Sequence, residues 1–592
     1  MVAGARTQVV DEPQPEHPGD QIMLKKVAVE SAAEAYLELL ASRGVEYFFG
    51  NAGTDFAPII EAYAKRAAEG QVLPRAITVP HEITAIGMAH GYAMVTGRPQ
   101  VVMVHVIVGT ANALGGIINA ARAQVPMLFT AGRNPLTEGA LPGARNRQIH
   151  WAQESFDQGA MVREFVKWDY EARLPSQLET LVDRALAIAT SEPAGPVYLT
   201  LPREVLAERM EQVEYFERPR LTADAATVPE PAAIERAAAA LVAARSPIVI
   251  VKAAGRDPGA VAPLVALAET LGMPVFDFHP THLNFPQGHP LHAGFDPAPH
   301  LDEADLVVAV EADAPWFPRL RAPRPEARVI QVAHDPLFSR YPYRGFAVDL
   351  GLAGTPRLTL AALAEAVRRA APDPAAVADR RDRWTDEHHR TRQAWAAALA
   401  RVRGDAPLDM AWVSRCVADL VDDHTLVVNE YDLDRTAAPF DTPGTYFGAP
   451  PPAGLGWGLG AALGAKLAAP ERTVICCVGD GAYIFGAPTA AHWTARAHGL
   501  PVLFVVFNNR GWNAVKRAVR FHAPEGWAAR TGAMPMSDLD PPPDYELVAR
   551  SCGAHAERVE DPAALPAALA RALRVVRVDG RQALVNVMCK KP

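Results

Sequence analysis

The sequence predicts an α/β protein built from three doubly wound parallel-sheet domains, and three observations support this fold class. Short apolar runs rich in β-branched residues alternate with longer segments rich in Ala and Leu, which is the pattern of buried parallel strands separated by helices. Several of the apolar runs end in Gly, Asn or Asp, as expected where strands reach a ligand-binding rim. With 592 residues the chain is also too long for a single core.

The overall composition is that of an ordinary globular protein. Lys and Arg number 58 against 67 Asp and Glu, a formal net charge of −9, so we expect no nucleic-acid partner and no anionic membrane surface. No window approaches 18 uninterrupted apolar residues. The five cysteines have no CxxC spacing and are expected to be small buried hydrophobes in a cytoplasmic protein.

The first predicted domain covers residues 25–205, after a polar, Pro-containing segment over 1–24 that we expect to be a disordered tail. The expected helices lie at 31–43, 59–68, 84–95 and 112–123, and the expected strands at 47–49, 76–79, 101–108, 126–130 and 195–202. This alternation indicates a doubly wound sheet.

The other two domains follow the same plan. A central domain is predicted over 221–370 and a solvated linker helix over 371–407, where the sequence is charged and flanked by Pro. The third domain is predicted over 408–592. The expected strands of these two domains lie at 247–251, 274–276, 306–310, 329–332, 426–429, 473–478 and 502–507.

The strands at 473–478 and 502–507 end in Gly479-Asp480-Gly481 and Asn508-Asn509, and a helical segment joins them. Because parallel strands present their carboxyl ends at one rim, Asp480 and Asn509 should meet there. Glycines let backbone amides approach a phosphate closely, whereas an aspartate would repel it. A divalent cation between them removes the conflict, and carboxylate and amide oxygens suit Mg²⁺. The pattern predicts a metal-bridged diphosphate site.

Gly479-Asp480-Gly481 with Asn508-Asn509 resembles the thiamine diphosphate motif, and the chain from about Lys25 to Val587 resembles the family of benzoylformate decarboxylase, pyruvate decarboxylase and acetolactate synthase. The resemblance implies thiamine diphosphate and Mg²⁺ as cofactors. It assigns the metal to Asp480, Asn509 and the Gly511 carbonyl. The other cofactor contacts it implies in this segment are Gly479, Gly481 and Ala482.

By the same resemblance, Glu82 is the carboxylate that faces the cofactor's aminopyrimidine and helps it act as a base. Taken alone, Glu82 is equally consistent with an acidic residue at a helix N-terminus. Leu455 matches the apolar wedge that bends the cofactor, and the Ala453 carbonyl matches the acceptor for its amino group. The neighbouring glycines do not meet the GxGxxG spacing of a dinucleotide site.

Two histidines are candidate acid–base groups. His105 interrupts an apolar strand near its carboxyl end, where an isolated histidine is more often a hydrogen-bonded core residue. However, this chain resembles benzoylformate decarboxylase here, because that enzyme carries a catalytic histidine at the same distance after its glutamate as His105 lies after Glu82. Its second catalytic histidine matches His289, in the loop over 284–294, although a loop histidine is more often solvated.

The expected substrate pocket contains Thr54, Ala514 and Val515, and the Pro- and Gly-rich segment over 519–543 is expected to be a loop that covers the site. The chain departs from the family at Glu430-Tyr431-Asp432, where hydroxyl residues often lie near the diphosphate. This departure puts diphosphate contacts from that segment in doubt.

The resemblance implies a non-oxidative 2-oxo acid decarboxylase with carboligase potential, acting on a small molecule. It also implies a homodimer or homotetramer with the active sites at subunit interfaces. Alternatives that use the same cofactor are an acetolactate synthase-like carboligase and a 2-hydroxyacyl-CoA lyase. Four arginines could bind the CoA phosphates of the latter, namely Arg319, Arg321, Arg324 and Arg328. A non-catalytic diphosphate-binding regulator is the alternative from another class.

Overall fold

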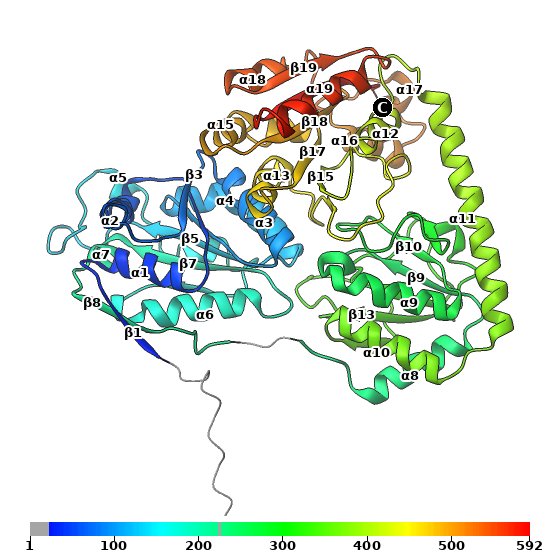
Figure 1. Cartoon of the computed structure of the whole chain (residues 1–592), viewed down its shortest axis with the longest axis horizontal. Coiled ribbons are helices and arrows are strands. Elements are labelled where there is room, and N and C mark those ends of the chain that lie inside the picture. The colour runs from blue at the N-terminus through cyan, green and yellow to red at the C-terminus, as the bar shows by residue number, and fades with distance from the viewer. Residues whose placement is uncertain (1–22, 223–225, 592) are drawn as a thin grey trace, which may run out of the picture.

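Three six-stranded parallel sheets, each with helices packed against it, form the body of the molecule in the part of the chain described by the computed structural model, residues 23–222 and 226–591 (Figure 1). This agrees with the predicted fold class. Of the tail expected over 1–24, only residues 23 and 24 lie within the described residues, and Leu24 begins a strand. No described helix is long and apolar enough to cross a membrane.

The first domain contains a parallel sheet of order β3-β2-β4-β5-β7-β6. It extends past the expected residue 205, because β8 returns to pair antiparallel with β1. The elements of this domain are β1 (Leu24–Ala28), α1 (Ala32–Ser42), β2 (Tyr47–Gly50), α2 (Ala57–Ala68), β3 (Arg75–Thr78), α3 (Glu82–Thr96), β4 (Val101–Val104), α4 (Val106–Arg122), β5 (Met127–Arg133), α5 (Ile149–Ala152), β6 (Asp169–Glu171), α6 (Leu178–Thr190), β7 (Pro196–Pro202), α7 (Arg203–Ala207) and β8 (Gln212–Phe216).

The central domain has the sheet order β11-β10-β9-β12-β13-β14. Its elements are α8 (Pro231–Ala243), β9 (Pro247–Val251), α9 (Val261–Leu271), β10 (Val275–Asp277), β11 (His292–Gly294), β12 (Leu306–Val310), β13 (Arg328–Ala333), β14 (Leu350–Ala353) and α10 (Pro356–Arg369). The linker helix α11 (Pro374–Val402) then runs along one side of the molecule to the third domain (Figure 1).

The third domain has the sheet order β16-β15-β17-β18-β20-β19. Its elements are α12 (Met410–Ala418), β15 (Thr425–Glu430), β16 (Tyr446–Gly448), α13 (Trp457–Ala468), β17 (Thr473–Gly479), α14 (Asp480–Phe485), α15 (Pro488–His498), β18 (Val502–Asn508), α16 (Asn513–His522), α17 (Trp527–Thr531), α18 (Tyr545–Ser551), β19 (His555–Val559), α19 (Leu565–Arg577) and β20 (Ala583–Met588).

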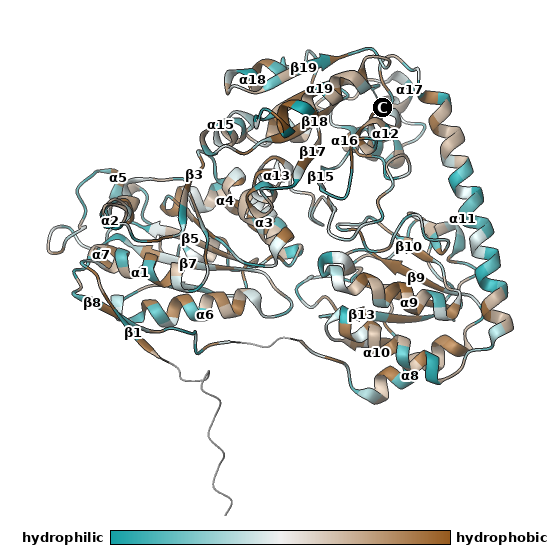
Figure 2. Cartoon of the chain, viewed as in Figure 1, coloured by the Kyte–Doolittle hydropathy of each residue, from teal (hydrophilic) through white to brown (hydrophobic). Residues whose placement is uncertain are grey.

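Hydropathy follows this architecture. Strands such as β9 and β18 are apolar along their length, whereas α11 is largely hydrophilic (Figure 2). The sequence predicted α11 as a solvated helix, and this is wrong for the face that carries His388. His388 is buried, and its Nδ1 lies 3.0 Å from the His292 carbonyl oxygen, so one face of α11 packs on the central domain. All five cysteines are buried and unpaired, as expected.

The first and third domains share one continuous cluster of buried apolar residues, because α3 packs directly on α13. The helices approach through glycines. A Cβ atom at Gly91 would lie 2.0 Å from the Ala461 carbonyl oxygen, and one at Gly464 would lie 1.9 Å from the Met88 carbonyl oxygen. Larger residues at these positions would force the helices apart. The central domain has a separate core.

Candidate active site

The predicted metal corner forms where β17 and β18 end at the same rim. Asp480 is the first residue of α14, and Asn509 directly follows β18. Both side chains are almost completely buried. Asp480 Oδ2 accepts a hydrogen bond of 3.1 Å from the Gly511 amide, and Ala482 lies buried in the same turn.

One oxygen of each of these two side chains, Asp480 Oδ1 and Asn509 Oδ1, is buried without a hydrogen-bond partner among the described residues. Burying such oxygens is costly unless they bind something. Burial also raises the pKa of Asp480 to about 6, a cost that a cation would offset. The described residues contain no cluster of three His, Cys, Asp or Glu for a metal, but a single carboxylate with amide and carbonyl oxygens fits Mg²⁺.

The glycines beside Asp480 allow neighbouring side chains to pack closer than a Cβ atom would permit. A Cβ atom at Gly481 would lie 2.6 Å from the Trp512 ring, and one at Gly479 would lie 2.2 Å from Asp432 Oδ2. Asp432 therefore lies next to the metal corner, and its pKa is raised to about 7 by burial and then by the nearby charge of Asp480. The sequence placed this segment in doubt as a diphosphate contact, and the structure adds a second carboxylate there.

Glu430 has a different position from its neighbour Asp432. Its two carboxylate oxygens accept hydrogen bonds of 2.6 Å from the amides of Gly456 and Gly458. Glu430 thus holds the loop that carries Ala453 and Leu455, rather than facing a phosphate. Ala453 has a φ of 60°, a left-handed conformation that is costly for a residue with a side chain and is found where the surroundings enforce it.

Glu82 lies at the start of α3, where the first domain meets this loop. The side chain is buried; Oε1 accepts a hydrogen bond of 2.7 Å from Asn51, and Oε2 accepts one of 2.5 Å from Asn112. The next residue, Ile83, lies close to Gly456, because a Cβ atom added to Gly456 would be 3.2 Å from the Ile83 side chain. Glu82 and Leu455 therefore belong to adjoining segments of the same chain.

A second connection joins these segments. Asn119 on α4 donates to the Gly454 carbonyl at 2.8 Å and accepts from the Gly454 amide at 3.0 Å. The sequence reasoning missed all three asparagines, Asn51, Asn112 and Asn119. Asn51 directly follows β2, so the rim argument applied to Asn509 could also have found it.

His105 follows a shorter strand than expected. The strand predicted over 101–108 ends at Val104, and α4 begins at Val106. The reason is pairing: β2 ends at Gly50, opposite Met103, so β4 has no neighbour on that side beyond this point. His105 therefore lies at the rim and not within the strand.

Asp55 forms a hydrogen-bonded pair with His105, and the sequence analysis did not find it. The distance from His105 Nδ1 to Asp55 Oδ1 is 2.5 Å, and the other Asp55 oxygen accepts the Val106 amide at 3.3 Å. The hydrogen bond to Asp55 raises the pKa of His105, outweighing the opposing effect of burial. With Nδ1 bonded to a carboxylate, Nε2 is the nitrogen left to exchange a proton.

Of the remaining predicted residues, Thr54 adjoins this group, since it directly precedes Asp55 in the same turn of helix. His289 contacts Glu269 at 3.4 Å through Nε2 and accepts the Leu291 amide through Nδ1, so both its nitrogens face the central domain. Thr54 lies 3.5 Å from His150. Ala514 and Val515 lie on the exposed face of α16. The single chain does not bring His289, Ala514 or Val515 to Glu82, and their roles stay predictions.

The segment over 519–543 was expected to be a covering loop, which is wrong in part. Its first residues belong to α16, and Trp527–Thr531 form α17. Trp527 is 77% exposed, so its side chain covers no site within the single chain. Gly and Pro lie at the helix ends, where they are compatible with short helices.

Known proteins match this chain along nearly its whole length. Three family models of the thiamine pyrophosphate enzymes match in succession. The N-terminal TPP binding domain matches residues 30–161, the central domain matches residues 234–363, and the C-terminal TPP binding domain matches residues 432–587. Benzoylformate decarboxylase of Pseudomonas aeruginosa is 28% identical over 93% of this chain and 98% of its own length. A probable 2-ketoarginine decarboxylase of the same organism is 30% identical over 90% of both chains.

A solved structure has the same fold. The thiamine diphosphate-dependent 4-hydroxybenzoylformate decarboxylase of Rhodococcus jostii superimposes with a TM-score of 0.74 at 24% identity, covering 95% of this chain and 99% of its own. The three-domain α/β architecture predicted from the sequence is therefore confirmed.

We expect the substitution Asp55→Asn to lower the pKa of His105, because the bond to a charged carboxylate is what raises it. A histidine pKa raised in the folded state contributes stability below the ordinary value of 6.5, and this contribution is lost as the pH rises through the folded-state pKa. The variant should be less stable than the wild type by about 1–2 kcal/mol near pH 6, with a smaller difference near pH 9. Thermal unfolding across this range measures the effect.

Asp382→Asn on the exposed surface of α11 is the control for a lost carboxylate. An Asp55→Asn stability difference that does not change with pH would contradict the pairing of Asp55 with a protonated His105.

Proposed function

Because the chain belongs to the thiamine pyrophosphate enzymes, we propose that it is a thiamine diphosphate- and Mg²⁺-dependent decarboxylase of a 2-oxo acid, with carboligase potential. The reaction is non-oxidative and resembles that of benzoylformate decarboxylase.

The observation that carries this proposal is the position of Glu82. Its carboxylate is buried, each oxygen is held by an asparagine, and the start of α3 touches the loop that carries Leu455. A protein that only bound a diphosphate would need the metal corner at Asp480 but no fixed carboxylate at the other end of the ligand. The pair of sites therefore favours catalysis over a regulatory binding role.

Thiamine diphosphate supplies a carbon nucleophile that adds to the 2-oxo group and accepts the electrons left when CO₂ departs. The chain's own residues orient and exchange protons. Glu82 would hold a proton against the aminopyrimidine ring, and the Ala453 carbonyl would accept a hydrogen bond from its amino group. Leu455, packed against the core shared by the first and third domains, would support the bent form of the cofactor.

Asp480 and Asn509 would hold Mg²⁺ at the diphosphate, with the Gly511 carbonyl as a third ligand. Support comes from the two buried oxygens without partners and from the raised pKa of Asp480, about 6. The metal would also reduce the repulsion that Asp432 and Asp480 impose on a diphosphate.

His105 is the acid–base group we propose for the reacting carbon. Asp55 fixes the ring through Nδ1 and keeps the protonated form available to higher pH, so Nε2 can donate a proton after CO₂ leaves. His289 was the second histidine implied by the resemblance. Its catalytic role stays a prediction, because both of its nitrogens contact the central domain.

The alternatives within the same cofactor chemistry are an acetolactate synthase-like carboligase and a 2-hydroxyacyl-CoA lyase. The 2-hydroxyacyl-CoA lyase alternative requires arginines that are free to bind the phosphates of CoA. Arg321 already pairs with Asp302 at 2.8 Å, and Arg319 stacks over Phe521. Carboligation requires only that, after CO₂ leaves, the reacting carbon bonds to a second carbonyl compound instead of to a proton. It is therefore compatible with the proposed decarboxylase.

We also propose a homodimer or homotetramer with active sites at the subunit interfaces. Apolar side chains lie exposed beside the metal corner: Ile484 is 39% and Phe485 57% exposed, both on the helix that begins with Asp480. A second subunit packed there would bury them and exclude water from the site.

A cytoplasmic location is part of the proposal. All five cysteines are unpaired and buried, as is usual in a reducing compartment. Cell fractionation would check it.

We expect Glu82→Gln to reduce CO₂ release from the preferred 2-oxo acid by about 10²- to 10⁴-fold, because the amide cannot hold the same proton. Thiamine diphosphate binding, measured by calorimetry, should stay within a few-fold of the wild type. Glu61→Gln on the exposed face of α2 is the matched control. Equal CO₂ release from Glu82→Gln and Glu61→Gln would overturn the assignment of Glu82.

We expect a chelator to weaken thiamine diphosphate binding to the wild type by at least about tenfold, since the diphosphate would then face Asp480 and Asp432 without a cation. Asp480→Asn should weaken Mg²⁺-dependent binding similarly, while the exposed control Asp579→Asn should not. Calorimetry with and without Mg²⁺ measures both effects. Cofactor affinity that is independent of Mg²⁺ would contradict the metal site.

We expect Phe485→Glu to shift the protein toward smaller assemblies, because a charge would be buried at the proposed interface. Sedimentation equilibrium measures the molecular mass, and Val72→Glu at another exposed apolar position, 87% exposed, is the control. A wild type that sediments as a 63.6 kDa monomer would contradict the oligomer.

A further inference from the structure

A cavity of about 450 Å³ lies between the central and third domains, directly beside the loop that carries Ala453 and Leu455, here called the cofactor loop. Its central-domain wall includes Lys252, His279 and Phe317, and its third-domain wall includes Tyr431 and Ala453. The cavity shares Ala453 with the cofactor site, whereas Asp480, Asn509 and Leu455 do not line it. It therefore extends from the amino-group end of the cofactor site toward the central domain.

Three residues around this cavity have a left-handed backbone although none of them is glycine. The φ angles are 48° at His279, 75° at Tyr431 and 60° at Ala453. Each such residue costs of order 1–3 kcal/mol and persists only where its surroundings enforce it, which is most often at binding and catalytic sites. Their meeting at one cavity indicates that its wall is shaped for a ligand.

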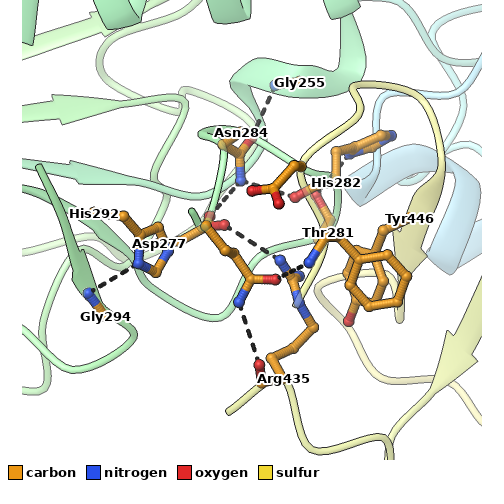
Figure 3. A network of polar contacts seen from close by, with 12 residues as sticks. Gly255, Asp277, Thr281, His282, Asn284, His292, Gly294, Arg435 and Tyr446 are labelled. Carbon is orange, nitrogen blue, oxygen red and sulfur yellow. Dashed lines mark hydrogen bonds and ion pairs between the residues drawn. The ribbon is translucent and has the colours of Figure 1, made fainter. Parts of the chain in front are cut away.

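A buried polar network holds the loop that carries His279. Asn284 donates to Asp277 at 2.7 Å and accepts the Gly255 amide at 2.8 Å (Figure 3). It also donates to the Lys252 carbonyl at 2.8 Å. These bonds fix the chain on both sides of His279.

The same network reaches the third domain. The Arg435 guanidinium lies 3.8 Å from Asp277 Oδ2 and over the ring of Tyr446, which lines the cavity, at 4.0 Å from its centroid (Figure 3). Both walls are therefore tied to one another, and the cavity exists before a ligand enters.

The charged group of the cavity wall that keeps unused hydrogen-bonding capacity is a donor, the Lys252 ammonium. Asp313 is the carboxylate in its wall, and its oxygens already accept from Lys252 at 2.5 Å, the Ala314 amide at 2.9 Å and the Tyr341 hydroxyl at 2.8 Å. The Lys252 ammonium has three hydrogens, and Asp313 is the side chain it contacts among the described residues.

His279 adds a second donor. It is exposed to the cavity and packs between the rings of Phe278 and Phe317, with centroids 4.5 and 5.4 Å away. Burial, and then the charge of Lys252, lower the pKa of His279, so the neutral ring offers one N–H donor beside one acceptor nitrogen. Phe317, Pro450 and Pro451 form the apolar part of the remaining wall, which also contains Asn429, Tyr431 and Tyr446.

We propose that this cavity binds the side chain of the 2-oxo acid, and that Lys252 and His279 recognise a hydrogen-bond acceptor, a carboxylate or a hydroxyl, at the far end of that side chain. The inference rests on the proposed decarboxylase function and names its substrate class: 2-oxo acids whose apolar side chain ends in an acceptor group. Lys252 and His279 are specificity-determining residues and take no part in the bond that breaks.

The test measures binding separately from turnover. Calorimetry on protein loaded with thiamine diphosphate and Mg²⁺ compares 2-hydroxy acids, which lack the carbonyl needed for reaction, in pairs that differ only at the far end. One pair is 2-hydroxyglutarate and 2-hydroxypentanoate, and the other is 4-hydroxymandelate and mandelate. We expect the wild type to bind the acceptor-ended member of at least one pair about tenfold or more tightly. A preference within the first pair indicates recognition of a carboxylate, and a preference within the second pair indicates recognition of a hydroxyl.

Lys252→Met should abolish this preference while leaving the affinity for the apolar-ended acid and for thiamine diphosphate unchanged. Because that variant leaves the buried Asp313 without its cation and could fold poorly, His279→Gly provides a second test. Glycine suits a φ of 48°, so this variant should fold and still lose about threefold or more of the preference. Lys26→Met, at an exposed pair with Glu214 in the first domain, is the control.

Equal binding within both pairs would overturn the inference, as would a preference unchanged in both variants. Tighter binding of 5-guanidino-2-hydroxypentanoate, whose side chain ends in a cation, would also overturn it. Loss of thiamine diphosphate binding in His279→Gly would assign the cavity to the cofactor instead. Failure of the proposed function is seen separately, as absence of CO₂ from every 2-oxo acid despite a normal preference among the 2-hydroxy acids.

Discussion

The close packing of α3 on α13 is the constraint on which the site depends. Glycines on both helices allow backbone to touch backbone, with Gly91 against Ala461 and Gly464 against Met88. This contact joins the first and third domains through one core and brings the start of α3, at Glu82, to the loop that carries Leu455. A methyl group on either glycine would force the helices apart and shift Glu82 relative to this loop.

The acidic residues around this site are distinguished by how their oxygens are satisfied. Glu430 is bonded by two backbone amides and acts on the loop, whereas Glu82 is held by two asparagines. Asp480 has one oxygen without a partner, and Asp432 lies beside it with its pKa raised to about 7. Repulsion between Asp432 and Asp480 favours a cation at this corner, so the same residues that would repel a diphosphate alone favour a diphosphate with its metal.

The sequence was sufficient to predict the parts of the protein that depend on periodicity and on strand ends. Buried strands such as β17 and β18, and the meeting of Asp480 with Asn509, follow from apolar runs and the geometry of parallel sheets. Asn51 directly follows β2 and could have been found by the same rule. His279, in contrast, could not, because no local pattern signals a left-handed backbone at a histidine. The end of β4 also depended on its neighbour β2 rather than on its own residues.

The division of labour between domains follows from where the polar groups lie. The metal corner, the glutamate and the His105–Asp55 pair come from the first and third domains, whose shared core fixes their spacing. The central domain has its own core and meets the cofactor loop through a cavity with strained backbone and unused donors. Residues there can change without moving the groups to which we assign proton exchange and metal binding. In the function that we propose, substrate choice and chemistry therefore belong to separate packing units that are joined by the Asp277–Arg435 contact.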